Sequence, residues 1–272
     1  MTELYLGDCV EVMRKNIADG SIDLVVTSPP YDNLRKYGGD AALPEGKFQE
    51  VAKELYRVVK DGGVIVWVVN DATINGSKTG TSFRQALFFQ SIGFNINDVM
   101  IWQKKNPMPV VKQPRYQDVF EYMFVFSKGK PKTFNPIMVP CKCAGQSYDS
   151  TCKNMGGESG RTKKSFEINK EKVDSNIWQI AIAQNKTGHP AVFPEELARK
   201  HVLSWSNKGD VVLDPFMGSG TVGIVCQERN RDFIGIDINR DYIEMAKKRI
   251  TDKDFAEIPC LFRKEELPLK KF

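Results

Sequence analysis

The sequence predicts a doubly wound α/β fold, built on a mostly parallel sheet of seven strands and interrupted by one large insertion. The first observation is that short apolar runs alternate along the chain with stretches whose apolar residues recur at helical spacing. The second is that runs such as 22–27 and 64–69 are almost continuously apolar, as strands buried on both faces of a parallel sheet are. The third is size, because 272 residues with 41% hydrophobic content can bury the core of one such domain.

Each predicted element rests on its periodicity and on the residues that end it. Residues 48–59 carry apolar side chains at helical spacing and are followed by Asp61-Gly62-Gly63, which indicates a helix and its end. Residues 83–92 form a second predicted helix, which stops at Gly93. The sequence therefore predicts strands at 4–6, 22–27, 64–69, 97–102, 120–126, 211–213 and 233–236, and helices at 10–17, 48–59, 83–92, 194–205, 221–229 and 241–250.

The segment 128–175 loses this periodicity and is rich in glycine, serine, lysine and asparagine. It holds 10 Lys and Arg against 5 Asp and Glu, an excess equal to the +5 net charge of the whole chain. Such a basic segment suggests a polyanionic partner, although a solvated lysine-rich loop explains it equally well when it stands alone. We therefore divide the chain into a core domain at 1–127 and 176–256, an insertion at 128–175 and a charged tail at 257–272.

Composition excludes several classes of protein. No apolar run reaches the ~18 residues of a membrane span, and no basic start followed by an apolar stretch marks a signal peptide, so we expect a soluble, cytoplasmic protein. The six cysteines are then expected as reduced thiols. Cys141, Cys143 and Cys152 cluster, but the only histidines, His189 and His201, lie far along the chain, so free thiols are favoured over zinc and no metal is predicted.

A Gly-rich loop at 214–221 follows the predicted strand 211–213 and precedes a helix. Gly218 and Gly220 can adopt positive φ and allow close approach of a ligand to the backbone, and no lysine follows them as a phosphate loop requires. Asp237 ends the next strand, where an acid can accept both hydroxyls of a ribose. Together these features indicate a cofactor with a nucleoside and no pyrophosphate. A structural glycine turn with a surface aspartate is the alternative.

A second motif, Ser28-Pro29-Pro30-Tyr31, follows the predicted strand 22–27. The prolines fix the backbone, so the Ser28 hydroxyl and the Pro29 carbonyl can be held in a set geometry. Two such acceptors can hold the protons of a base amino group and free the nitrogen lone pair. Tyr31 offers a ring on which an extruded base can stack. The alternative is a proline-rich end of a strand.

These two motifs, in this order, resemble those of the β-type DNA amino-methyltransferases, which methylate cytosine N4 or adenine N6 with S-adenosylmethionine. The resemblance covers most of the chain. It implies a Rossmann-like methyltransferase fold with a circularly permuted motif order, and catalytic roles for Ser28, Pro29, Pro30 and Tyr31. It further implies a set of cofactor-binding residues, namely Asp8, Cys9, Thr27, Asp214, Pro215, Phe216, Gly218, Ser219, Gly220, Thr221, Asp237, Ile238, His189 and Pro190.

The same resemblance assigns roles within that set. Asp237 would take the ribose hydroxyls, Ile238 would pack on the adenine, and Asp8 would bind the adenine amino group. The stretch that begins with His189-Pro190 resembles the closing motif that helps to hold the methionine end.

Double-stranded DNA is the partner that the resemblance implies. The basic insertion occupies the place of the target-recognition region, and Arg35 and Lys36 follow the catalytic motif in a loop that could close over the site. The predicted DNA contacts are Arg35, Lys36, Lys104, Lys105, Lys112, Arg115, Arg161, Lys163 and Lys164. A cognate restriction endonuclease, and a monomeric or a homodimeric state, are all compatible with the sequence.

The target base is the open point of this interpretation. Serine at the first motif position is commoner in the cytosine-N4 enzymes, so cytosine is favoured over adenine N6. A DNA-binding module that has lost catalysis and an RNA methyltransferase remain as alternatives. Methylation at cytosine C5 needs a thiolate nucleophile, usually in a Pro-Cys pair, at the place that Ser28-Pro29-Pro30-Tyr31 occupies here.

Overall fold

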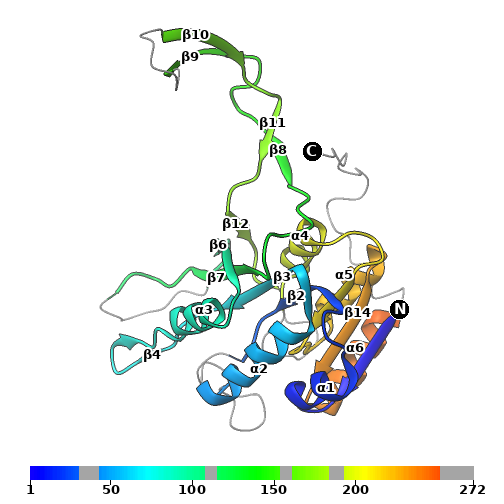
Figure 1. Ribbon diagram of the computed structural model, residues 1–272. Helices are drawn as coiled ribbons and strands as arrows, with labels where there is room; N and C mark the ends of the chain where they lie inside the picture. The colour runs from blue at the N-terminus through cyan, green and yellow to red at the C-terminus, as the bar shows by residue number, and fades with distance from the viewer. Residues whose placement is uncertain (31–42, 108–114, 154–160, 184–192, 252–272) are drawn as a thin grey trace. The chain divides into compact units, whose positions relative to one another are not determined.

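The computed structural model describes residues 1–30, 43–107, 115–153, 161–183 and 193–251 (Figure 1). The main strands are β1 (Thr2–Leu6), β2 (Ile22–Thr27), β3 (Val59–Val69), β6 (Asn95–Lys104), β7 (Phe120–Ser127), β12 (Ile177–Ile180), β13 (Val211–Asp214) and β14 (Asp232–Asp237). The helices are α1 (Cys9–Asn16), α2 (Glu45–Val58), α3 (Thr81–Ser91), α4 (Glu195–Trp205), α5 (Thr221–Glu228) and α6 (Arg240–Thr251). The short strands are β4 (Thr73–Ile74), β5 (Ser77–Lys78), β8 (Met138–Pro140), β9 (Ser147–Lys153), β10 (Arg161–Glu167) and β11 (Glu171–Val173).

The main sheet has eight strands in the order β1-β14-β13-β2-β3-β7-β6-β12. The predicted mostly parallel α/β sheet is confirmed, but it has one strand more than the seven predicted. The additional strand, β12, pairs in parallel with β6 and aligns Trp178 with Trp102. Its four residues are too few to give a periodic signal in the sequence, and pairing with β6 defines them as a strand. Only β7 runs antiparallel to its neighbours, β3 and β6.

Helices cover both faces of this sheet (Figure 1). Helices α1, α2 and α3 share one hydrophobic cluster with residues of the sheet, among them Val25 of β2 and Trp67 of β3. Leu24 and Val26 are also fully buried but lie outside that cluster. Alternate residues of β2 therefore face opposite layers, and α4 and α6 pack on the second face through contacts with β2, β1 and β14. A strand buried on both faces explains why 22–27 reads as one apolar run.

The described chain divides into two compact units, Pro136–Ser175 and the remainder. The smaller unit contains two antiparallel pairs, β8 with β11 and β9 with β10, where the sequence predicted no regular elements. All three residues of β11 are exposed, so this pair lacks the alternation of buried and exposed residues that reveals a strand. The unit lies inside the range 128–175 that the sequence marked as an insertion.

In the described part of the chain, no helix is both long enough and apolar enough to cross a membrane.

Candidate active site

Two neighbouring parallel strands, β2 and β13, end side by side at the carboxyl edge of the sheet. Val212 pairs with Leu24 and Leu213 with Val25, so the two strand ends lie at one level. The Thr27 hydroxyl donates a 2.7 Å hydrogen bond to Asp214 Oδ1, and both side chains are buried. The bond links Thr27, which immediately precedes Ser28-Pro29-Pro30, to Asp214, the first residue of the Gly-rich loop. Ser28 is half-buried and Pro29 is buried.

The Gly-rich loop is shaped by backbone hydrogen bonds. The Phe216 amide donates to Asp214 Oδ1 at 3.1 Å, and the Met217 amide donates to the Ile236 carbonyl at 3.0 Å. Gly218 and Gly220 have φ values of 52° and 79°, so the predicted positive φ at both positions is confirmed. A Cβ on Gly220 would lie 2.7 Å from the Cβ of Ala246. Only glycine therefore fits where the loop meets α6.

Asp237 lies at the end of β14, beside this loop. Its Oδ2 accepts a hydrogen bond from the Gly218 amide and its Oδ1 accepts one from the Asn239 amide, each at 2.8 Å. Each carboxylate oxygen can accept a further hydrogen bond. The two amides therefore orient the Asp237 carboxylate so that it can accept hydrogen bonds from two hydroxyl groups. Ile238, the next residue, is 76% exposed, and such an exposed apolar side chain offers a face for a flat ring.

The residues at this edge fit the nucleoside end of a cofactor. Helix α5 begins at Thr221, and its cap residue Gly220 has no side chain to satisfy the first amides of the helix. The paired acceptors of Asp237 and the apolar face of Ile238 complete a site for ribose and base.

Burial dominates the electrostatics of the two loop carboxylates. It raises the pKa of Asp214 to about 7, against hydrogen bonds from Thr27 and the Phe216 amide that lower it; the nearby Asp237 raises it further. Burial also raises the pKa of Asp237, which the amides of Asn239 and Gly218 counter. Burial therefore favours the protonated form of Asp214 and Asp237 more than it would be favoured in an exposed aspartate.

Asp8 follows β1 and caps α1. It accepts hydrogen bonds from the amides of Val10 and Glu11 at 3.1 and 3.2 Å, and Lys47 binds the same oxygen at 2.8 Å. Burial raises the pKa of Asp8, but the Lys47 ammonium and the two amides outweigh it, so the net pKa is lowered. Cys9 is buried, and desolvation raises the pKa of its thiol to about 12, so that it lies as a neutral thiol beside the cap.

The other predicted site residues, mostly the expected DNA contacts, have different surroundings in the structure. Lys104 pairs with the buried Glu121 at 2.8 Å, and Arg115 bonds Thr73 and the Gly76 carbonyl, so both cations have partners within the protein. Lys105 is exposed. The backbones of Arg161, Lys163 and Lys164 lie in β10, opposite Lys153, Thr151 and Ser150 of β9. Tyr31, Arg35, Lys36, Lys112, His189 and Pro190 lie outside the described residues.

Sequence reasoning missed two residues that shape this edge. Lys47 reaches Asp8 from α2, 39 positions along the chain, and no local pattern marks that pairing. Asn239 holds Asp237 through its amide and also accepts from the Asp241 amide. An asparagine two residues beyond the acid and just before a helix is a recognisable turn and cap signal.

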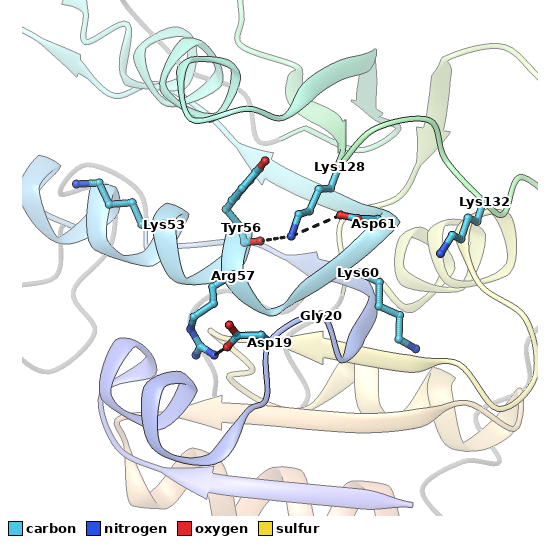
Figure 2. A pocket seen from close by; sticks show the side chains of 9 residues that line it. All are labelled: Asp19, Gly20, Lys53, Tyr56, Arg57, Lys60, Asp61, Lys128 and Lys132. Atoms are coloured by element: carbon cyan, nitrogen blue, oxygen red, sulfur yellow. Dashed lines mark hydrogen bonds and ion pairs between the residues drawn. The ribbon is translucent and has the colours of Figure 1, made fainter.

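A basic pocket lies at the opposite, amino-terminal edge of β2 and β3 (Figure 2). It has a volume of about 780 Å³ and is lined by Asp19, Gly20, Lys53, Tyr56, Arg57, Lys60, Asp61, Lys128 and Lys132. Several of its charges are used for packing. Arg57 pairs with Asp19 and also donates to the Met13 and Ile17 carbonyls at 2.8 and 3.0 Å. Lys128 donates to the Tyr56 and Val59 carbonyls at the end of α2. This edge therefore fastens α1, α2 and the sheet together.

Known proteins give an independent view of the chain. A family model described as DNA methylase matches residues 22–248. The orphan methyltransferase M.BamHII of Bacillus amyloliquefaciens is 47% identical over 249 residues, which cover 88% of this chain and 92% of that protein. The type II methyltransferase M.HpaI of Haemophilus parainfluenzae is 34% identical, with 89% and 71% covered.

Solved structures agree on the fold. The M1.HpyAVI–SAM complex superposes with a TM-score of 0.61 at 25% identity, covering 92% of this chain and all of that one (100%). PvuII DNA methyltransferase, described as cytosine-N4-specific, gives a TM-score of 0.69 at 21% identity, with 93% and 87% covered. At that identity the second likeness concerns the fold alone.

Proposed function

This chain belongs to the N6/N4 DNA methylase family and is an S-adenosylmethionine-dependent DNA methyltransferase, and on that premise we propose that it methylates cytosine N4 within one recognition sequence. The observation that supports methyl transfer at this edge is the buried Thr27–Asp214 hydrogen bond of 2.7 Å, and the choice of cytosine rests on Ser28. The hydrogen bond fixes the beginning of Ser28-Pro29-Pro30 against the beginning of the Gly-rich loop. An amino group held by the first segment would thus lie next to a cofactor held by the second.

On the cofactor side, four features would hold S-adenosylmethionine. The Asp237 oxygens would accept the ribose hydroxyls, and the exposed Ile238 side chain would cover the adenine. The Gly218–Gly220 backbone admits the ligand, and the Asp8 carboxylate lies at the neighbouring strand end. S-adenosylmethionine supplies an electrophilic methyl group when bound.

On the substrate side, the chain must make a poor nucleophile reactive. The lone pair of a base amino nitrogen is delocalised into the ring. Hydrogen bonds from its two N–H groups to Ser28 Oγ and to the Pro29 carbonyl would favour a pyramidal nitrogen and free the lone pair. Pro29 is buried, which keeps its carbonyl from shifting. A serine is a neutral acceptor, and in members of the family that it resembles serine at this position is commoner for cytosine N4.

The unit Pro136–Ser175 is proposed to recognise the target sequence. Its β10 strand carries Arg161, Lys163 and Lys164 in one short run, which suits contacts with DNA phosphates. Lys104 and Arg115 are set aside from this role because their charged groups have partners inside the protein. A partner restriction endonuclease stays a prediction from the sequence.

Base-resolved sequencing tests this proposal. Plasmid DNA from cells that express the protein is sequenced by a method sensitive to modified bases, and its nucleosides are identified by mass spectrometry. We expect N4-methylcytosine in one sequence context. Ser28→Ala should bind the cofactor as the parent does but lose about 10²- to 10³-fold in turnover, as when one preorganised polar group is removed.

The outcomes separate the alternatives. If N6-methyladenine is found in one sequence context instead, the target base is adenine and the cytosine proposal is wrong. Equal modification by parent and Ser28→Ala would contradict the role of Ser28. No modified base in DNA, with methyl transfer to structured RNA, would contradict the DNA substrate.

A further inference from the structure

A small β-hairpin projects from the carboxyl edge of the sheet, next to the end of β3. Strands β4 and β5 pair Thr73 with Lys78 and Ile74 with Ser77, and every residue from 73 to 78 is exposed. The turn between them is Asn75-Gly76, with φ values of 49° and 78°. Positive φ at both central residues is typical of the type I′ turn, whose twist matches that of the two strands. Figure 1 shows β4 extending beyond the sheet.

The hairpin lies at the edge where the chemistry takes place. Thr27 of β2 is paired with Trp67 of β3, and β3 ends two residues later at Val69. The chain then runs through Asn70, Asp71 and Ala72 into the hairpin. The element therefore rises from the strand adjacent to the one that carries Ser28.

Several contacts hold the base of the hairpin rigid. The Thr79 amide donates to the Ala72 carbonyl at 3.0 Å. Asp71, which is buried, accepts hydrogen bonds from the amide and the hydroxyl of Ser82 at 2.8 and 2.9 Å. Lys78 binds the Asp71 carbonyl and forms an ion pair with Asp118. These contacts join the hairpin to α3 and to the segment before β7.

Arg115 adds a brace along the hairpin itself. Its guanidinium donates to Thr73 Oγ1 at 3.1 Å and to the Gly76 carbonyl at 2.7 Å, so it spans from the first strand to the turn. A two-stranded hairpin alone is marginally stable in water, and this one buries none of its own residues. The bracing thus keeps an exposed element in a fixed position, which is the arrangement expected of a recognition element on a rigid scaffold.

The shape and the chemistry of the hairpin fit one groove of DNA. Paired strands lie about 4.8 Å apart, and with their side chains they match the major groove, about 12 Å wide, and exceed the minor groove, about 6 Å wide. Asn75 at the tip carries an amide of the kind that reads adenine, and Ile74, 50% exposed, is an apolar group of the kind that contacts a thymine methyl.

We propose that the β4–β5 hairpin enters the major groove beside the target base and that Asn75 reads a base pair of the recognition sequence. This inference rests on the proposed DNA methyltransferase function. It adds to that function a specificity determinant in the catalytic domain, separate from the unit Pro136–Ser175.

The chain offers a matched pair of variants for the test. Asn75→Gly removes the side chain and keeps a residue that accepts positive φ. Asn230 is the other described asparagine with positive φ, at 57°, and it lies just before β14 at the amino-terminal edge. Asn230→Gly is therefore the same chemical change in the same backbone conformation, at the edge away from the site. Melting temperature and cofactor binding by calorimetry establish that both variants are folded.

We expect Asn75→Gly to lower kcat/KM on a duplex with the recognition sequence by about tenfold to a hundredfold, the discrimination that one good base contact supplies. Methylation should also spread to sites that differ at one base pair, and any protection of guanine N7, which faces the major groove, from dimethyl sulfate should be lost there. Asn230→Gly should leave all three readouts unchanged.

Two failures can be told apart. If the parent methylates DNA and Asn75→Gly matches it in kcat/KM, in site preference and in N7 protection, the hairpin assignment is overturned and the methyltransferase function stands. If the parent methylates no DNA, the proposed function fails first and takes the hairpin assignment with it.

Discussion

The two edges of the central sheet both collect charged residues, and they use them differently. At the carboxyl edge, the carboxylates of Asp214 and Asp237 accept hydrogen bonds from backbone amides of the Gly-rich loop and of the turn after β14. At the amino-terminal edge, Arg57 pairs with carboxylates and donates to carbonyl groups in the last turn and at the cap of α1. The first arrangement leaves acceptor positions on Asp237 for a ligand. In the second, the guanidinium of Arg57 binds groups of the protein itself.

This difference distinguishes a candidate ligand-binding site from charged residues that stabilise the packing of helices on the sheet. A carboxylate bound to loop amides sets the shape of a backbone that a ligand can approach. A cation that neutralises a neighbouring acid and satisfies nearby carbonyls holds elements together. The pocket of Figure 2 is lined mostly by charged residues, yet two of its cations, Arg57 and Lys128, bind carbonyl groups of the protein in this second way. Size and charge alone would point to this pocket rather than to the candidate site at the carboxyl edge.

The largest effect expected from this comparison concerns Asp237. Asp237→Ala removes both acceptors for ribose hydroxyls and the bond that holds the Gly218 amide at 2.8 Å. Hydrogen bonds to charged groups contribute about 1.5–3 kcal/mol each, so cofactor affinity should fall about tenfold to more than a hundredfold, with DNA binding retained. Calorimetry measures both. Asp61→Ala, an exposed acid of the opposite edge, serves as the control, and equal affinity in Asp237→Ala and the parent would refute the ribose assignment.

A smaller effect, on stability alone, is expected at the amino-terminal edge. Arg57→Met keeps the alkyl stem and removes the bonds to the Met13 and Ile17 carbonyls and to Glu54. Because the Arg57 side chain is 27% exposed, we expect a loss of about 1–2 kcal/mol in the free energy of unfolding. Urea titration measures it, and turnover per folded molecule should not change.

Lys15→Met is the matched control for Arg57→Met. Lys15 and Glu11 form an exposed ion pair at 3.7 Å. We expect Lys15→Met to lower the free energy of unfolding by about 0.5 kcal/mol or less. Equal losses in the two variants would show that Arg57 is an ordinary surface charge.

A further prediction concerns the pH dependence of stability. Burial raises the pKa of Asp214 to about 7, above its ordinary value of about 3.9. Between these values the folded protein binds more protons than the unfolded chain, so this group lowers stability as pH rises through that window. Asp214→Asn removes the titration. We expect the free energy of unfolding of Asp214→Asn, relative to that of the parent, to be higher at pH 8 than at pH 5. Unfolding titrations at both pH values measure this difference. If it is the same at both pH values, the pKa of Asp214 lies near its ordinary value.

Most of the fold could be predicted because its strands and helices carry strong local patterns. The strand predicted at 22–27 is β2 (Ile22–Thr27), and the helix predicted at 48–59 is α2 (Glu45–Val58). The strand predicted at 64–69 begins earlier, at Val59. The glycines at 62 and 63 suggested the end of the preceding helix, but pairing of Ile22 with Val59 extends the strand through them. The pairs β8–β11 and β4–β5 escaped prediction because they are short and largely exposed.

The candidate site was predictable where it depends on residue type and order. Sequence alone determined the α/β class, the order of the two motifs, the need for glycine at 218 and 220, and the acid at the end of β14, because backbone sterics and strand periodicity are local properties. Only the tertiary structure decided that Thr27 donates to Asp214, 187 positions away. It also decided that Lys104 and Arg115 bind other residues of the protein and that an exposed hairpin is braced next to the end of β3. Those contacts join segments distant in the chain, and a buried group takes whichever partner the packed sheet brings within hydrogen-bonding distance.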